Sequence, residues 1–82
     1  MKNKIRAGPV HKIPADLRKV IHSSKAMKKE WENLTPLGRN EWICWVEEAK
    51  KDETRNHRIE RTHNEIMQGK RRPCCWAGCI HR

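Results

Sequence analysis

Four tryptophans are the only large aromatic residues in this chain of 82 residues, which contains neither Phe nor Tyr. Each indole can bury roughly 150–250 Å² of surface, so the positions of the tryptophans largely decide where a core can form. Trp31, Trp42 and Trp45 all lie at helical spacings from other apolar residues. Because no segment alternates polar and apolar residues long enough for a strand, the pattern predicts helices that bury these three indoles together.

Length and composition limit the chain to one small domain. Apolar residues make up 35% of the chain and charged residues another 35%, which is near the polar limit of sequences that still fold. No apolar run approaches the roughly 20 residues needed to cross a bilayer, and the basic first residues lack the apolar segment of a secretory signal. We therefore expect a cytoplasmic protein whose thiols stay reduced unless a metal holds them.

Helix start and stop signals divide the chain further. A first helix is expected from Ala15 to about His22, where the apolar residues recur at helical spacing. Ser24 is a good N-cap for a second helix, and Thr35 followed by Pro36 is a strong start signal for a third. The second and third of these predicted helices contain the indoles that we expect to form the core.

The fourth predicted helix runs from Glu53 to about Gln68, with Asp52 as its cap and Gly69 as its C-terminal stop. The predicted fold class is therefore all-α, a small bundle of about four helices with a flexible basic arm before it and a Cys-rich tail after it. The arm covers residues 1–12, the helical domain residues 13–70 and the tail residues 71–82.

A short turn around Lys51 to Glu53 is expected to make the third and fourth helices antiparallel neighbours. The fourth helix has only a thin apolar stripe, so it needs the wide stripe of the third to supply hydrophobic bulk. The stripe of the third helix consists of Trp42, Trp45, Val46 and Ala49, extended by Leu37, with Asn40, Glu47 and Lys51 pointing outward. The inward positions of the fourth helix are Ile59, Thr62, Ile66 and Met67.

The formal net charge of +9 is unevenly distributed, because both ends of the chain are basic and the middle is acidic. A chain built to bind phosphate along its length would gain from a continuous basic face. Nucleic-acid binding through the basic arm and tail is an alternative function on this pattern. A basic cluster beside the first helix makes an anionic membrane surface a third kind of partner, which we rank last because the core needs the widest apolar face.

Several short motifs stand out along the predicted helices. They are IPADL at 13–17, LTP at 34–36 and WVEEAKK at 45–51, followed by TR at 54–55 and RI at 58–59. Together these motifs resemble the YdeI/OmpD-associated family. The resemblance implies a small all-helical domain linked, in bacteria, to bacteriocin protection, envelope stress and resistance to cationic antimicrobial peptides, without an agreed catalytic activity. Many relatives carry this helical piece at the end of a longer chain, with a separate domain before it.

The matching motif at the start of the fourth helix is the candidate binding site. The motif consists of Thr54, Arg55 and Arg58. Thr54 and Arg55 lie near backbone amides that a helix leaves without an internal partner, where an anion or a carboxylate is favoured. The alternative is that the arginines serve only local ion pairs on neighbouring turns. The acidic residues considered for such pairs are Glu47, Glu48 and Glu60.

The tail is the one place where the sequence suggests a metal. Cys79 and His81, together with Cys74 or Cys75, supply three ligands for zinc, which takes four in a closed structural site. The fourth would be His57 or His63, folded back from the last helix. The alternatives are a disulfide from Cys74 or Cys75 to Cys79, or reduced thiols.

No catalytic constellation follows from the sequence. Cys44 is turned away from the tryptophan stripe by the helical period, and we expect an unreactive small side chain there. A cysteine nucleophile would need a neighbouring base and a pocket that excludes water. We therefore predict that the chain is not an enzyme and has no small-molecule substrate. The predicted function is a binding module for a protein partner.

Overall fold

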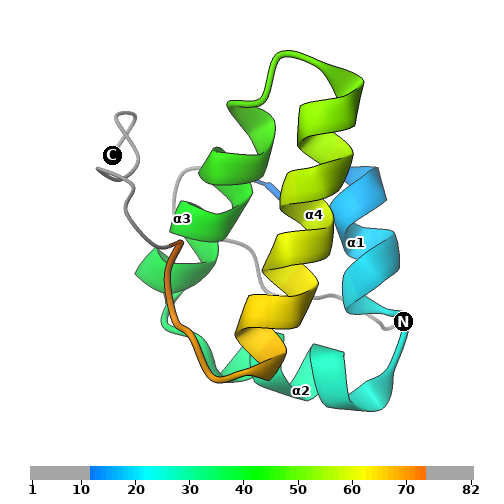
Figure 1. The fold of residues 1–82 in the computed structure, drawn as a ribbon. Helices are drawn as coiled ribbons and strands as arrows, with labels where there is room; N and C mark the ends of the chain where they lie inside the picture. The colour runs from blue at the N-terminus through cyan, green and yellow to red at the C-terminus, as the bar shows by residue number, and fades with distance from the viewer. Residues whose placement is uncertain (1–11, 74–82) are drawn as a thin grey trace.

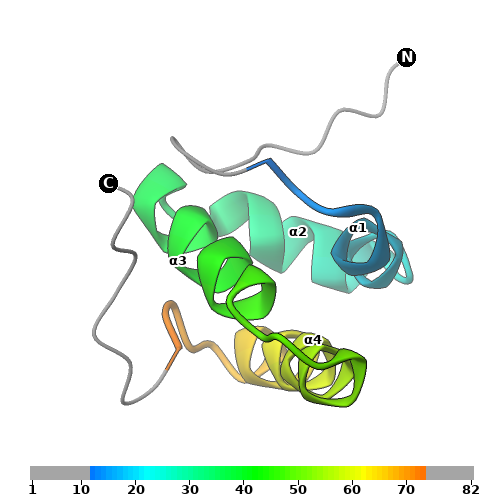
Figure 2. The ribbon, with the colours of Figure 1, turned by 90° about the horizontal axis from the view of Figure 1, so that it is seen from above.

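The structure is a computed structural model that describes residues 12–73, and within them it contains four helices and no strand (Figure 1). This confirms the predicted all-α class. The helices are α1 (Ala15–Ile21), α2 (Lys25–Asn33), α3 (Pro36–Glu47) and α4 (Asp52–Met67). α4 packs against each of the other three helices, which lie along one side of it in Figure 2. None of the four has the length and apolar character needed to cross a bilayer.

The predicted caps of α2 and α3 are confirmed. The Ser24 hydroxyl accepts a hydrogen bond from the Met27 N–H at 3.1 Å, and the Thr35 hydroxyl accepts one from the Gly38 N–H at 2.9 Å, with Pro36 at the first helical position. The predicted Asp52 cap is wrong, because Asp52 is already the first residue of α4. Its carboxylate still suits the positive end of the helix.

Gly69 stops α4 as predicted, through a Schellman motif that follows the last helical residue, Met67. Gly69 adopts the left-handed conformation with φ of 95°, which is open to glycine without a steric penalty. The Lys70 N–H donates to the Glu65 carbonyl at 3.0 Å and the Gly69 N–H donates to the Ile66 carbonyl at 2.9 Å. The chain after α4 therefore leaves the helix in a fixed direction.

The core contains the three indoles, as the sequence predicts. Trp31 and Trp42 are fully buried and Trp45 is 7% exposed, and the rings of Trp42 and Trp45 meet edge to face with centroids 5.8 Å apart. The inward side of α4 is confirmed at three of its four predicted positions, Ile59, Thr62 and Ile66. The fourth, Met67, is 41% exposed, so that prediction is wrong.

The outward side of α3 is also predicted wrongly in part. Asn40 is fully buried rather than exposed, and Leu37 is 39% exposed rather than part of the core. The reason is that every residue from Gly38 to Val46 is buried, so α3 is enclosed on all sides over that length. The spacing of apolar residues along a helix predicts which side faces solvent only when one side of the helix is exposed. Glu47 and Lys51 are exposed, as expected.

Candidate functional site

Arg55, the central residue of the predicted site, joins α4 to α1. Its Nε donates to Asp16 Oδ2 at 2.6 Å and its Nη2 donates to Asp16 Oδ1 at 3.0 Å, which is the two-pronged geometry that makes arginine–carboxylate pairs strong. These hydrogen bonds lower the pKa of the Asp16 carboxyl, and the positive charge of Arg55 and the Leu17 N–H act in the same direction. Asp16 was not among the predicted partners, since it lies 39 residues away in sequence.

Arg58 turns to a different neighbour, the end of α3. Its Nη1 donates to the Trp45 carbonyl at 2.7 Å and lies 3.6 Å from Glu48 Oε1. Its guanidinium also lies over the Trp45 ring, 5.2 Å from the centroid. The alternative of a local ion pair with Glu48 is therefore confirmed for Arg58.

The geometry separates the two arginines of the predicted site. Arg55 reaches toward α1 and Arg58 toward α3, two different helices that both lie on the same side of α4 in Figure 2. Thr54 is exposed in the first turn of α4, where the N-cap residue Lys51 makes no side-chain hydrogen bond to the free amides. Anion binding by Thr54, Arg55 and Arg58 stays a prediction, and it would have to compete with the contacts that both arginines already make.

Two further arginines have defined roles that the sequence analysis missed. Arg61 also lies 5.2 Å from the Trp45 centroid, and its Nε donates to Glu65 Oε2 at 2.8 Å. Arg39 is 3% exposed, and its Nη1 donates to the carbonyls of Leu34 at 2.5 Å and Glu32 at 3.3 Å. A cation is favoured beside the carbonyls at the C-terminal end of a helix. The i, i+4 spacing of Arg61 and Glu65 is a usable sequence signal, whereas nothing local marks Arg39.

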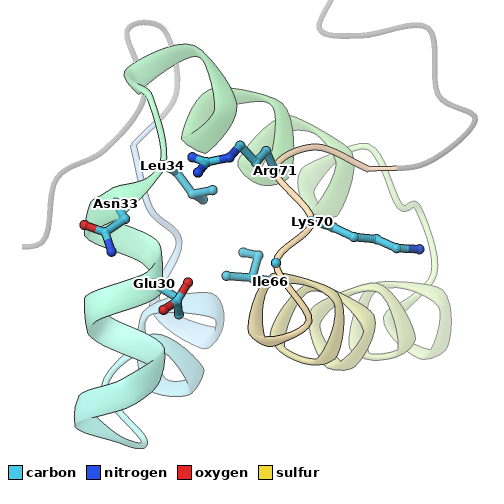
Figure 3. A pocket seen from close by; sticks show the side chains of 7 residues that line it. Glu30, Asn33, Leu34, Ile66, Lys70 and Arg71 are labelled. Carbon is cyan, nitrogen blue, oxygen red and sulfur yellow. The ribbon is translucent and has the colours of Figure 1, made fainter.

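A small cleft lies between α2 and the chain that follows α4 (Figure 3). It has a volume of about 90 Å³. Its lining residues come from α2, the end of α4 and the segment after it, and they are Glu30, Asn33, Leu34, Ile66, Gly69, Lys70 and Arg71. This is a surface that the sequence analysis did not anticipate, because it is built from residues more than thirty positions apart.

The C-terminal segment, residues 69–73, is fixed to α3, and its first three residues form one wall of the cleft. The Trp42 indole N–H donates to the Arg71 carbonyl at 3.1 Å. Gly38 permits this close approach, because a Cβ at that position would lie 3.1 Å from the same carbonyl oxygen. Pro73 is buried.

The predicted zinc ligands, Cys74, Cys75, Cys79 and His81, lie outside the described residues. Between residues 12 and 73 no group of three or more side chains is arranged to hold a metal ion. The disulfide that the sequence allows in the tail also lies outside this range. Cys44 is buried, as a small apolar side chain would be.

Comparison with known proteins gives one match. A sequence model of the family described as "Bacteriocin-protection, YdeI or OmpD-Associated" matches residues 11–69. The matched stretch is well over half of the chain and contains α1, α2, α3 and α4. No curated protein and no solved structure gives a match.

Proposed function

Because the chain belongs to the bacteriocin-protection family of YdeI/OmpD-associated proteins, we propose that it is a helical binding module without catalytic activity. It acts through a protein partner in the bacterial response to envelope stress or to cationic antimicrobial peptides. The observation that carries the proposal is the family match over residues 11–69, which includes the whole helical bundle.

The use of polar groups in the bundle supports a binding role rather than an enzymatic one. Arg55, Arg58 and Arg61 hold helices or an indole in place, so their charges serve the fold. The cleft is lined by no His, Cys, Ser or Thr, the side chains that most often act as nucleophiles or as bases near neutral pH. A surface of this kind suits recognition of another macromolecule.

Expression in a bacterium that lacks a member of this family tests the proposal. Cells with the chain are expected to survive a cationic antimicrobial peptide better than cells with the empty vector or with an unfolded variant such as Ile66→Asp. Equal survival would refute the link to peptide resistance. Chemical cross-linking inside the protected cells tests for the partner. If the cells are protected but no protein is cross-linked to the chain, the proposed protein partner is refuted.

A second candidate function is nucleic-acid binding, favoured by the cations of α1 and α2. Arg18, Lys19, Lys25 and Lys29 are exposed, and none forms an ion pair with an acidic residue among those that the structure describes. Together with the net charge of +9, these residues would attract phosphate. An electrophoretic mobility shift at about 50 mM salt, lost at high salt, is the expected result. Unshifted duplex and single strands at low salt would exclude this function.

A further inference from the structure

We propose that the cleft between α2 and the C-terminal segment binds a small zwitterion, an α-amino acid of the size of glycine or alanine. Its ammonium group lies beside Glu30 and its carboxylate beside Arg71. This goes beyond the proposed function, because it gives the cleft a ligand of its own in addition to the protein partner of the bundle. The site uses none of the arginines of the α4 motif.

Two opposite charges border the cleft without pairing with each other. Glu30 lies on α2 about one turn before Leu34, and the Arg71 side chain extends from the C-terminal segment toward Leu34 (Figure 3). Neither Glu30 nor Arg71 takes part in the ion pairs of the described residues, so their charged groups are too far apart to pair directly. Lys70 also lines the cleft, but its side chain points away from it (Figure 3).

This pair of charges favours a zwitterion over a simple ion. The Glu30 carboxylate repels an anion that approaches Arg71, and the Arg71 guanidinium repels a cation that approaches Glu30. A guanidinium binds a carboxylate through two parallel hydrogen bonds, and a carboxylate accepts hydrogen bonds from an ammonium group. A ligand with both groups therefore satisfies both walls of the cleft and leaves its net charge unchanged.

The lining and the volume of the cleft exclude a large or mainly apolar ligand. Leu34 and Ile66 are only 6% and 1% exposed, so the surface that a ligand would touch is more polar than apolar. A volume of about 90 Å³ is roughly three times the share of one water molecule in the liquid. It is well below the roughly 300–1,000 Å³ of sites for drug-sized ligands. Glycine and alanine fit this space, whereas amino acids with long side chains do not.

The wall that carries Arg71 is in place before a ligand binds. The Trp42 indole N–H donates to the Arg71 carbonyl at 3.1 Å, and the left-handed turn at Gly69 sets the direction of the chain. A site that is fixed in advance loses less entropy when a ligand binds. Because Arg71 is exposed and Glu30 half-buried, water screens their charges, and we expect dissociation constants in the millimolar range.

NMR titration with glycine at neutral pH tests the proposal, in about 0.15 M salt so that long-range attraction is screened. The amide signals of Leu34, Gly69 and Arg71 are expected to shift and to saturate together. N-acetylglycine lacks the ammonium group and glycinamide lacks the carboxylate, so each should bind roughly tenfold more weakly or worse. Leucine carries both charges but has a larger side chain, and it should also bind more weakly than glycine.

Substitutions at the two charged residues test the assigned contacts. Glu30→Gln and Arg71→Gln should each weaken glycine binding roughly tenfold or more, because each removes a charge-assisted hydrogen bond. Glu60→Gln and Arg72→Gln are the matched controls, since both residues are exposed and neither lines the cleft. They change the net charge by the same amounts and should leave binding unchanged. An unchanged circular dichroism spectrum shows that each variant keeps its fold.

Three results would overturn the proposal. They are shifts that do not saturate, binding of N-acetylglycine or glycinamide as tight as that of glycine, and an unchanged dissociation constant in Glu30→Gln or Arg71→Gln. None of them affects the proposed function, which the survival and cross-linking experiments test without an amino acid ligand.

Discussion

Breaking the ion pair between Asp16 and Arg55 should loosen α1 from α4 by a measurable amount. The Asp16 side chain is 42% exposed and the Arg55 side chain 25% exposed, so solvent screens much of their attraction. Exposed pairs contribute about 0.2–1 kcal/mol, and the two-pronged geometry places this one toward the upper end. A coupling energy of about 1 kcal/mol corresponds to roughly 4–8 °C in melting temperature for a domain of this size.

The contribution of the Asp16–Arg55 ion pair to the free energy of unfolding should depend on pH in a defined direction. Arg55 lowers the pKa of Asp16 in the folded state, whereas the unfolded chain has the ordinary value of about 3.9. A carboxyl whose pKa falls on folding stabilises the protein fully above the unfolded-state value. That stabilisation is lost as the pH falls through the lower folded-state value. The difference between the wild type and Asp16→Asn should therefore be present at neutral pH and shrink progressively as the pH falls below the ordinary value of about 3.9.

A double-mutant cycle measures the coupling without the side effects of each substitution. It needs the wild type, Asp16→Asn, Arg55→Gln and the double variant, unfolded by urea and followed by far-ultraviolet circular dichroism. Glu60→Gln is the matched control, because Glu60 is exposed on α4 and should not couple to Asp16. A coupling energy near zero at neutral pH, or one that persists unchanged near pH 2, would show that this reasoning is wrong.

Three other substitutions test separate parts of the fold. Gly69→Ala should lower the free energy of unfolding, measured in urea, by about 1–2 kcal/mol, because φ is 95° at this position. No atom lies near enough to add a steric clash to that cost. An unchanged free energy of unfolding would refute the left-handed turn. Ser24→Ala should lower the free energy of unfolding by about 1 kcal/mol in the same assay. The loss is smaller if a water molecule takes over the hydrogen bond from the Met27 N–H. Trp42→Phe removes the donor to the Arg71 carbonyl and should speed tryptic cleavage after Arg71, followed by mass spectrometry. An unchanged cleavage rate would contradict that anchor.

The helices could be predicted because their signals are local. Ser24, Thr35 and Gly69 each act on backbone groups within five residues, so their effects can be deduced without knowledge of the tertiary structure. The burial of Trp31, Trp42 and Trp45 follows from their helical spacing to other apolar residues and from the lack of any Phe or Tyr in the chain. The existence of the core could therefore be deduced as reliably as its helices.

The contacts of the candidate site could not be predicted, because they depend on how the helices are arranged. Nothing near Arg55 in the sequence indicates that α1 brings Asp16 within 2.6 Å of it. Arg39 and Asn40 look like solvent-facing residues of an amphipathic helix, yet both are buried because α3 is enclosed. Polar residues can occupy such positions where hydrogen bonds compensate their lost hydration, as the Leu34 and Glu32 carbonyls do for Arg39.

The contact between Asp16 and Arg55 also limits what the arginine motif of α4 can bind. An external anion binds the Nε and Nη2 of Arg55 only by displacing the Asp16 carboxylate, so its affinity for those two donors is reduced by the coupling energy of that pair. About 1 kcal/mol corresponds to roughly a fivefold loss in affinity. The same displacement would remove one of the contacts between α1 and α4, while Leu17 and Ile21 of α1 stay buried in the shared core. Anion binding at the motif and the contact between Asp16 and Arg55 are therefore mutually opposed, whereas the cleft beside Arg71 can be filled without breaking any ion pair of the described bundle.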